Sequence, residues 1–418
     1  MKINTQCLML WMQMIASGIL ISSSMATMAG NITQPSYFGL HIHKADTGTA
    51  WPKVKFGSWR LWDSNVQWPQ LEPEKDQWHF EQLDRYVAMA KLTNVSVLLP
   101  LGLSPRWASA RNNEPASYGN GSAAEPRNLE DWRNYVRTVA QRYKGRITEY
   151  EIWNEPNDKG FFSGSTASLV ELTCAAYAIL KETDPGIKLV SPGYTGVQNL
   201  KLLDEFLAKG GSKCIDVVSY HLYVIPSPPE AMLPVVSHLQ EVMRNRGVGN
   251  LPLWNGESGW AMANEDGTSD RGRPPSWENL NGHQMAAYVA RALVLGRAAG
   301  LERFYWYSWD HTFMGLIEPT AKTFKPSASA YGAVIDWLTN REAPACAEAG
   351  DIWLCRIKPE ADGERLIVWR TKSGQSTFTV PPGRTIASAD RADLQAVKVL
   401  MPGQIGIDDV PTMIRLAH

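Results

Sequence analysis

Short apolar runs alternate with amphipathic stretches eight times over roughly 300 residues, and this alternation limits the fold more than any other sequence feature. The apolar run 95–101 has almost no polar alternation, which is typical of a strand inside a parallel sheet. Eight strand–helix repeats predict an α/β protein, a closed (β/α)8 barrel rather than an open doubly wound sheet. The expected strands are 37–43, 57–63, 95–101, 147–153, 188–192, 215–223, 251–257 and 303–310. The expected helices are 80–92, 129–143, 168–182, 200–208, 230–246, 284–299 and 326–340.

Near the carboxyl end the pattern changes to short runs of alternating polarity, among them 365–369 and 375–380. Turn residues such as Asp362-Gly363 separate these runs, as in antiparallel sheets. We therefore expect a catalytic barrel over residues 30–345 and a small β-sandwich domain over residues 346–418.

The first residues resemble an export signal. Lys2 is followed by an apolar run over 7–21 and by small residues up to Ala29. The run is shorter than the ~20 residues that a membrane span needs. We expect residues 1–29 to be removed and the mature chain to be exported, to the periplasm or the medium, with no membrane span; a retained anchor is the alternative.

The cysteines permit two disulfides. Once Cys7 is removed with the signal, four of the five cysteines remain, an even number in an exported chain. Cys346 and Cys355 are close enough in sequence to join a hairpin, whereas pairing Cys174 with Cys214 is only a guess. The spacings match neither a zinc site nor a redox motif.

Composition argues against several classes of function. The net charge is −1, whereas nucleic-acid binding needs a basic surface. No Gly-x-Gly-x-x-Gly follows the first strand, which argues against a dinucleotide. We expect no cofactor and no metal. The 17 tryptophans fall often near strand ends, where aromatic faces suit sugar rings, although most of them could be ordinary core residues.

Glu155 follows the fourth predicted strand, within Trp153-Asn-Glu-Pro156. Pro156 ends the strand, because it has no N–H to donate and disfavours a helical conformation of the preceding residue. The apolar, aromatic setting should raise the pKa of Glu155, which would then act as a general acid near neutral pH. The plain alternative is a strand-end glutamate that meets solvent or a helix terminus.

Glu257 ends the seventh predicted strand, and the carboxyl ends of barrel strands share one face. By strict alternation Leu253, Asn255 and Glu257 lie on the same side of their strand. Glu151 also points inward but lies ~7 Å deeper than Glu155, so we expect a buried hydrogen-bonding residue there.

Two carboxyl groups across a sugar-sized gap are what glycoside hydrolysis requires. Arg60 could keep Glu257 ionised by opposite charge, and the Tyr223 hydroxyl could orient it. The alternatives are a structural ion pair for Arg60 and a packed aromatic for Tyr223.

The chain resembles the retaining (β/α)8 glycoside hydrolases of clan A, and most of all family 39 and the related endoglycosidases of exopolysaccharide clusters. The resemblance stands on Trp153–Pro156 and Asn255–Trp260, with weaker support from patterns within 68–84, 104–107 and 315–331. It covers nearly the whole mature chain.

The resemblance implies a role for each matching residue. These roles are acid/base for Glu155, nucleophile for Glu257, a contact with the sugar 2-hydroxyl for Asn154, lining of the site for His221 and Tyr223, and a stacking platform for Trp309. The chain departs from the commoner Thr-Glu form by having Gly256 before the nucleophile, which puts the usual neighbour contact in doubt.

Two long loops, 104–127 and 261–282, fall on the same face as the two glutamates and could wall an extended groove. We therefore expect endo action on a β-linked exopolysaccharide, with exo action by a β-glycosidase such as a β-xylosidase as the alternative. The expected partner is a polysaccharide or oligosaccharide, and we expect a monomer. The sugar and the linkage do not follow from the sequence.

Two other classes of protein compete. His41, His43, His221 and Asp310 resemble the ligands of metal-dependent amidohydrolase barrels, but the expected lysine on strand four and histidine on strand five are absent. The plainer interpretation of His43 is a polar lining of a sugar pocket, or a satisfied core histidine. A non-catalytic carbohydrate-binding relative is the second competitor, although both glutamates are present.

Overall fold

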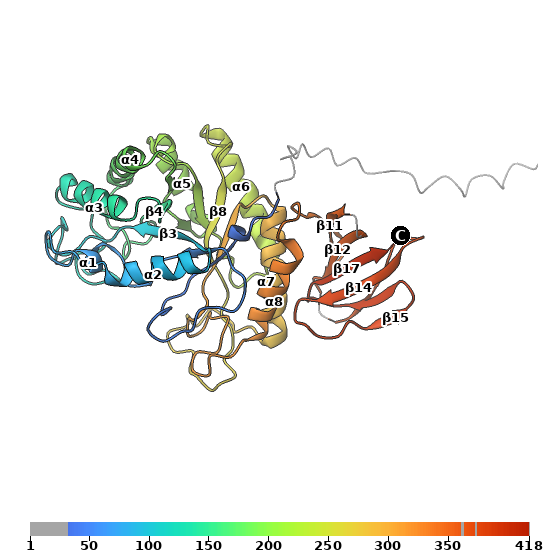
Figure 1. Cartoon of the computed structure of the whole chain (residues 1–418). Helices are drawn as coiled ribbons and strands as arrows, with labels where there is room; N and C mark the ends of the chain where they lie inside the picture. Colours follow the sequence, from blue (N-terminus) through green and yellow to red (C-terminus); the bar gives the residue numbers. More distant parts are fainter. Residues whose placement is uncertain (1–31, 361–362, 373, 418) are drawn as a thin grey trace, which may run out of the picture. The chain divides into compact units, whose positions relative to one another are not determined.

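The computed structural model describes residues 32–360, 363–372 and 374–417 (Figure 1). The predicted export signal, 1–29, lies outside the described residues. Among those that the structure describes, no helix is both long enough and apolar enough to cross a membrane.

One parallel sheet forms the centre of the first and larger part of the chain, in the order β5-β4-β3-β2-β1-β9-β8-β7-β6. Its strands are β1 (Phe38–Leu40), β2 (Ser58–Arg60), β3 (Ser96–Leu101), β4 (Glu149–Ile152), β5 (Lys188–Val190), β6 (Tyr194–Thr195), β7 (Val218–His221), β8 (Leu253–Ser258) and β9 (Arg303–Trp306).

The sheet closes on itself. β5 and β6 are two pieces of the fifth barrel strand, interrupted at 191–193, and bridges join Val190 to Val217 and Asn154 to Gly193. The Ser191 N–H also donates to the Val217 carbonyl oxygen at 2.9 Å. The predicted (β/α)8 barrel is therefore confirmed.

Helices follow the strands and lie outside the sheet (Figure 1). They are α1 (Trp68–Leu71), α2 (Glu81–Leu92), α3 (Leu129–Arg142), α4 (Thr166–Thr183), α5 (Leu200–Ala208), α6 (Met232–Asn245), α7 (Gly282–Ala298) and α8 (Pro326–Leu338), with short 3-10 turns at Pro35–Tyr37, Val197–Asn199, Gly211–Lys213 and Pro229–Ala231. Local chemistry fixes where the longest helices start, because Ser165 and Asn281 each close a capping box at the beginning of α4 and α7.

Several strands end earlier than the sequence predicts. The run 215–223 contains a strand only over Val218–His221, and the run 303–310 only over Arg303–Trp306. Residues such as Tyr223 and Tyr307 therefore lie in the loops that leave the barrel, where backbone pairing no longer fixes their direction.

Strand β8 contains a bulge that the sequence analysis did not foresee. Tyr220 pairs with Asn255 and His221 pairs with Glu257, so Gly256 is an extra residue on β8. A side chain on Gly256 would not fit, because its Cβ would lie 2.5 Å from Ser219 Oγ.

The bulge overturns the predicted alternation along this strand. Leu253 packs with the outer core between sheet and helices, whereas Trp254 belongs to the cluster inside the barrel. The prediction that Leu253, Asn255 and Glu257 share a face is wrong, because the extra residue turns Glu257 to the inside of the barrel mouth.

The carboxyl-terminal part, orange to red in Figure 1, consists of two antiparallel sheets with an apolar core of their own. Their orders are β10-β11-β12-β17-β14 and β13-β16-β15. The strands are β10 (Ala345–Ala349), β11 (Ile352–Glu360), β12 (Gly363–Arg370), β13 (Ser376–Thr379), β14 (Thr385–Arg391), β15 (Val399–Met401), β16 (Gln404–Ile407) and β17 (Thr412–Ala417). The expected C-terminal β domain is confirmed, and its boundary at 345/346 stays a prediction.

Both suggested disulfides are present. Cys346 and Cys355 join the paired strands β10 and β11, and Cys174 of α4 joins Cys214 ahead of β7. One disulfide ties α4 to the segment that leads into β7, and the other closes the first hairpin of the β domain.

The bulge generates a stability prediction. Gly256→Ala should destabilise the fold by about 1–3 kcal/mol in urea denaturation, since the new methyl group overlaps Ser219 and crowds His221. Adding Ser219→Ala should restore most of the loss, because Ser219 Oγ has no hydrogen-bond partner to forfeit. An unchanged midpoint for Gly256→Ala, or no recovery in the double variant, would contradict this steric account.

Candidate active site

Six of the predicted site residues meet at the carboxyl ends of the barrel strands. Arg60 ends β2, Asn154 and Glu155 follow β4, His221 ends β7, Tyr223 lies two residues beyond it, and Glu257 lies near the end of β8. Hydrogen bonds join Arg60 to Asn154 and Glu257, Tyr223 to Glu257, and His221 to Glu155; His221 Nδ1 also lies 4.0 Å from Glu257 Oε2. The predicted convergence of distant sequence positions on one face therefore occurs.

The turn after β4 sets the position of Glu155. Trp153 and Glu155 have φ angles of 53° and 39°, in the left-handed region that few non-glycine residues adopt. The Glu155 N–H donates to the Gly193 carbonyl oxygen at 3.0 Å, and Trp153 Nε1 donates to the Phe161 carbonyl oxygen at 2.6 Å. These bonds hold a conformation that the chain would not adopt alone.

Arg60 lies at the centre of the cluster and is fully buried. Its Nη1 donates to Glu257 Oε2 at 3.0 Å, its Nε to Glu151 Oε2 at 2.5 Å, and its Nη2 to Asn154 Oδ1 at 2.7 Å. All three guanidinium nitrogens are therefore used, and the expectation of a buried hydrogen-bonding Glu151 is confirmed.

Glu257 receives a donor on each carboxylate oxygen. Arg60 donates to Oε2, and the Tyr223 hydroxyl donates to Oε1 at 2.8 Å. Burial raises the pKa of Glu257 to about 7, with Glu155 raising it further and with His221, Arg60 and Tyr223 opposing. Both direct donors stabilise the ionised form.

Glu155 has a different environment. Its Oε1 lies 2.8 Å from His221 Nδ1, and burial lowers the pKa of that imidazole to about 4, so the ring is neutral near pH 7. Burial also raises the pKa of Glu155 to about 7; Arg60 opposes this change, whereas Asp158 and Asp63 add to it. Of the described residues, His221 is the only basic side chain within 4.0 Å of the Glu155 carboxylate.

The two carboxyl groups are close enough to titrate together. A carboxylate oxygen of Glu155, a carboxylate oxygen of Glu257 and a ring nitrogen of His221 all lie within 4.8 Å of one another. Near neutral pH the pair holds about one proton. The contacts place this proton on Glu155, because Glu257 has a guanidinium donor in direct contact and Glu155 has none.

A metal at these residues fits poorly. Glu155, His221 and Glu257 are close enough to hold a cation, but the buried Arg60 guanidinium already occupies Glu257 Oε2. Over the described ranges the other such group is His283, Asp408 and Asp409 on the surface.

These two groups of possible metal ligands do not support the amidohydrolase alternative. Neither group includes His41, His43 or Asp310. The Asp310 carboxylate instead accepts the backbone N–H groups of His43 and Lys44 at 2.9 and 3.1 Å.

Two predicted residues lie apart from the central cluster. The ring of His43 packs beside Tyr307, with centroids 5.1 Å apart. Trp309 is only 2% exposed and packs edge-on against Phe324. A buried indole leaves no free face for a sugar ring, so the structure does not support the stacking platform predicted at Trp309.

Other residues at the mouth have no role assigned from the sequence. The Asp63 carboxylate accepts the hydroxyls of Tyr118 and Tyr307, and Trp277 lies 6.1 Å from Tyr223 between ring centroids. Asp63 lies at the same predicted strand end as Arg60, so the sequence places it on this face, although it assigns it no role. Tyr118 and Trp277 come from loops without periodicity, which give no such signal.

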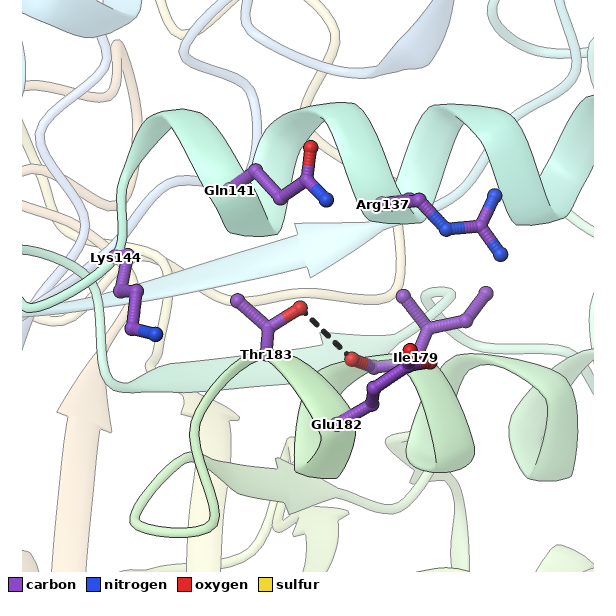
Figure 2. A pocket seen from close by; sticks show the side chains of 6 residues that line it. All are labelled: Arg137, Gln141, Lys144, Ile179, Glu182 and Thr183. Carbon is purple, nitrogen blue, oxygen red and sulfur yellow. Dashed lines mark hydrogen bonds between the residues drawn. The ribbon is translucent and has the colours of Figure 1, made fainter.

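A separate hollow of about 260 Å³ lies between the ends of α3 and α4 (Figure 2). These helix ends lie opposite the carboxyl ends of the strands, so the hollow is not part of the cluster. It is lined by Arg137, Gln141, Lys144, Ile179, Glu182 and Thr183.

Comparison with known families decides the class of protein. The model described as "Glycosyl hydrolases family 39" matches residues 54–262, half of the 418-residue chain. The chain belongs to family 39 of the glycosyl hydrolases. The predicted resemblance to family 39 is confirmed.

Curated relatives of this family 39 protein are similar over part of their length. A β-xylosidase from Caldicellulosiruptor saccharolyticus is 26% identical over 172 residues, which cover 38% of this chain and 34% of the relative. An endo-1,4-β-xylanase C from Paenibacillus barcinonensis is 22% identical over 191 residues, which cover 38% of this chain and 17% of the relative. The matched part thus spans about a third or less of each relative.

Solved structures share the fold over nearly the whole chain. A family 39 glycoside hydrolase from Bacteroides cellulosilyticus WH2 has a TM-score of 0.70 and 19% identity, covering 93% of this chain and 82% of that one. A monomeric β-xylosidase from Caulobacter crescentus CB15 has a TM-score of 0.66 and 16% identity, covering 93% and 97%.

The Arg60 contacts predict a large loss of stability when the guanidinium is removed. Arg60→Met should destabilise the fold by about 3–5 kcal/mol in urea denaturation, because it leaves Glu151 and Glu257 buried without a cation. Adding Glu151→Gln should recover part of the loss by removing one of those charges. A double variant less stable than Arg60→Met would contradict this explanation.

The raised pKa of Glu155 predicts how stability depends on pH. The folded state binds this proton more tightly than the unfolded chain, so its contribution is present below about pH 4.5 and is lost as pH rises through about 7. Glu155→Gln should match wild type at pH 5 and exceed it by about 1–3 kcal/mol at pH 8. A stability difference between Glu155→Gln and wild type that stays the same from pH 5 to pH 8 would refute the prediction.

Proposed function

We propose that this family 39 protein is a retaining glycoside hydrolase that cleaves β-linked polysaccharide by double displacement. The observation that carries the proposal is the gap of at most 4.8 Å between oxygens of Glu155 and Glu257. Retaining enzymes hold their two carboxyl groups ~5–5.5 Å apart, whereas inverting enzymes leave ~6.5–9.5 Å for a water molecule.

The unequal contacts of the two carboxyl groups assign the roles. Glu257, held ionised by Arg60 and Tyr223, attacks the anomeric carbon while the protonated Glu155 gives its proton to the departing glycosidic oxygen. The carbon–oxygen bond to the leaving group breaks and an ester to Glu257 forms. Glu155, now a carboxylate, takes a proton from water, whose oxygen attacks the anomeric carbon and releases Glu257.

Arg60 also prepares Asn154 for the sugar. Its Nη2 occupies Asn154 Oδ1, so the amide NH₂ points the other way and remains a donor. We assign this donor to the sugar 2-hydroxyl, as the family resemblance implies. His221 acts through Glu155 and keeps its carboxyl group facing Glu257.

For the substrate we propose a β-linked polymer cut within the chain, such as an exopolysaccharide. Both long loops reach the site: Tyr118 of 104–127 binds Asp63, and Trp277 of 261–282 lies beside Tyr223. Exo action is the alternative, because one similar protein is named a β-xylosidase and another an endoxylanase.

Export is part of the same proposal. Its support is the signal-like start of the sequence and the two disulfides, which form in oxidising compartments. The expectation of a monomer stays a prediction.

Variants of the two glutamates test the mechanism. Glu257→Gln should abolish turnover and covalent labelling by a mechanism-based fluorosugar, read by intact-protein mass spectrometry. Glu155→Gln should lose about 10²–10⁴-fold on unactivated substrates, keep much more activity on aryl glycosides with good leaving groups, and still be labelled. Full activity in either variant, or stoichiometric zinc in the active protein, would overturn the assignment.

Digest products test the mode of action. Incubation with xylan, mannan, glucan and exopolysaccharide should first release oligosaccharides of mixed length, because an open groove binds internal units of the polymer. Monosaccharide as the sole product from the earliest time point would refute endo action and favour the exo alternative.

A further inference from the structure

Asp63 is held at the barrel mouth by two phenols from distant parts of the chain. It lies three residues after Arg60, with φ 56°, a left-handed conformation that aspartate tolerates better than most residues. Tyr118 of the 104–127 loop donates to Oδ1, and Tyr307, just after β9, donates to Oδ2 at 2.7 Å. Each oxygen of the carboxylate therefore has a fixed partner.

The position of Asp63 relates it to both catalytic glutamates. Tyr307 is one strand away from Glu257, because its N–H donates to the Ser258 carbonyl oxygen at 2.8 Å. Burial raises the pKa of Tyr307 well above its usual value, and the charges of Asp63 and then Glu257 raise it further. Asp63 also contributes to the raised pKa of Glu155. The charge of Asp63 therefore acts on both Tyr307 and Glu155.

The carboxylate of Asp63 is not explained by an ion pair. Within the described ranges no lysine, arginine or histidine nitrogen pairs with it, and its residue is half-buried rather than enclosed. A carboxylate offers about four acceptor positions, of which the two phenols use two. The remaining positions can accept hydroxyl groups of a bound molecule.

The charges around this position are unfavourable for an anion. Asp63, Glu155 and Glu257 are acidic, and the three guanidinium nitrogens of Arg60 are already bonded to Glu151, Asn154 and Glu257. The His221 imidazole is neutral near pH 7. A sugar that carries a carboxylate would approach the negative charges of Asp63 and Glu257, and the Arg60 guanidinium is already bonded to other groups.

We propose that Asp63 determines specificity by accepting a hydroxyl of the sugar held next to the cleavage point, so that this position takes a neutral sugar and rejects a uronic acid. The inference rests on the proposed hydrolase function and adds the substrate class of its central sugar. Tyr118 and Tyr307 are positioning residues that fix the Asp63 carboxylate.

The test compares aryl β-glycosides that differ only at C6, such as glucoside with glucuronide and galactoside with galacturonide. Wild type should prefer the neutral member of the pair it hydrolyses, measured as the ratio of kcat/KM. In Asp63→Asn, the ratio of kcat/KM for the neutral substrate to kcat/KM for the acidic one should fall by about tenfold or more, equivalent to about 1.4 kcal/mol. Glu182→Gln removes a carboxylate from the hollow between α3 and α4, away from the cluster, and is the matched control, for which the ratio should stay near the wild-type value.

Equal hydrolysis of neutral and acidic members by wild type would overturn the inference whatever the variants do. An unchanged ratio in a folded Asp63→Asn protein would overturn it as well.

A binding measurement separates this inference from the hydrolase proposal. Calorimetry with Glu155→Gln should show binding of neutral β-linked oligosaccharides and binding of their C6-oxidised forms weaker by about tenfold or more. Suppose that wild type hydrolyses none of the substrates, that Glu155→Gln still binds the neutral forms more tightly, and that this preference is smaller in Asp63→Asn/Glu155→Gln. The inference then stands, and the proposed reaction fails. Equal binding of both forms overturns the inference, and binding of neither overturns both.

Discussion

The site depends on one buried positive charge. Desolvating the Arg60 guanidinium is costly, and the cost is offset only because each of its nitrogens meets an oxygen of Glu151, Asn154 or Glu257. These partners come from β4, the turn after it and β8, so the same interaction joins two distant strands and orients two groups for chemistry. Stability and the proposed activity are therefore linked through one side chain.

This fixed charge makes the two acids differ, although the pKa of each is raised to a similar value. Burial raises the pKa of Glu155 and of Glu257 to about 7, so desolvation alone does not distinguish them. The distinction comes from hydrogen bonding: a guanidinium and a phenol stabilise charge on Glu257, while Glu155 faces a neutral imidazole. One carboxyl group is suited to attack and the other to donate a proton, although both belong to the same residue type.

Features that depend on regular periodicity were predicted correctly from the sequence. The predictions failed where the backbone departs from that periodicity. Strand–helix alternation predicted the barrel, and the convergence of strand ends predicted that Glu155 and Glu257 meet. Alternation along β8 misplaced the face of Glu257, because a bulge at Gly256 adds a residue that no pattern marks. Trp309 was expected to be open, but the ladder of β9 ends at Trp306 and the chain then turns Trp309 into the core. Tyr118 was missed because its loop has no repeating pattern.

The gap in the fifth barrel strand has a consequence for the imidazole that faces Glu155. Gly193 ends this gap, and a Cβ there would lie 2.3 Å from His221 Nε2; a Cβ on Gly256, on the other neighbouring strand, would lie 3.2 Å from the same atom. The imidazole ring of His221 therefore lies in space that side chains at Gly193 and Gly256 would otherwise take up. A side chain at Gly193 would overlap the imidazole and one at Gly256 would crowd it, so the two glycines leave the space in which His221 faces Glu155.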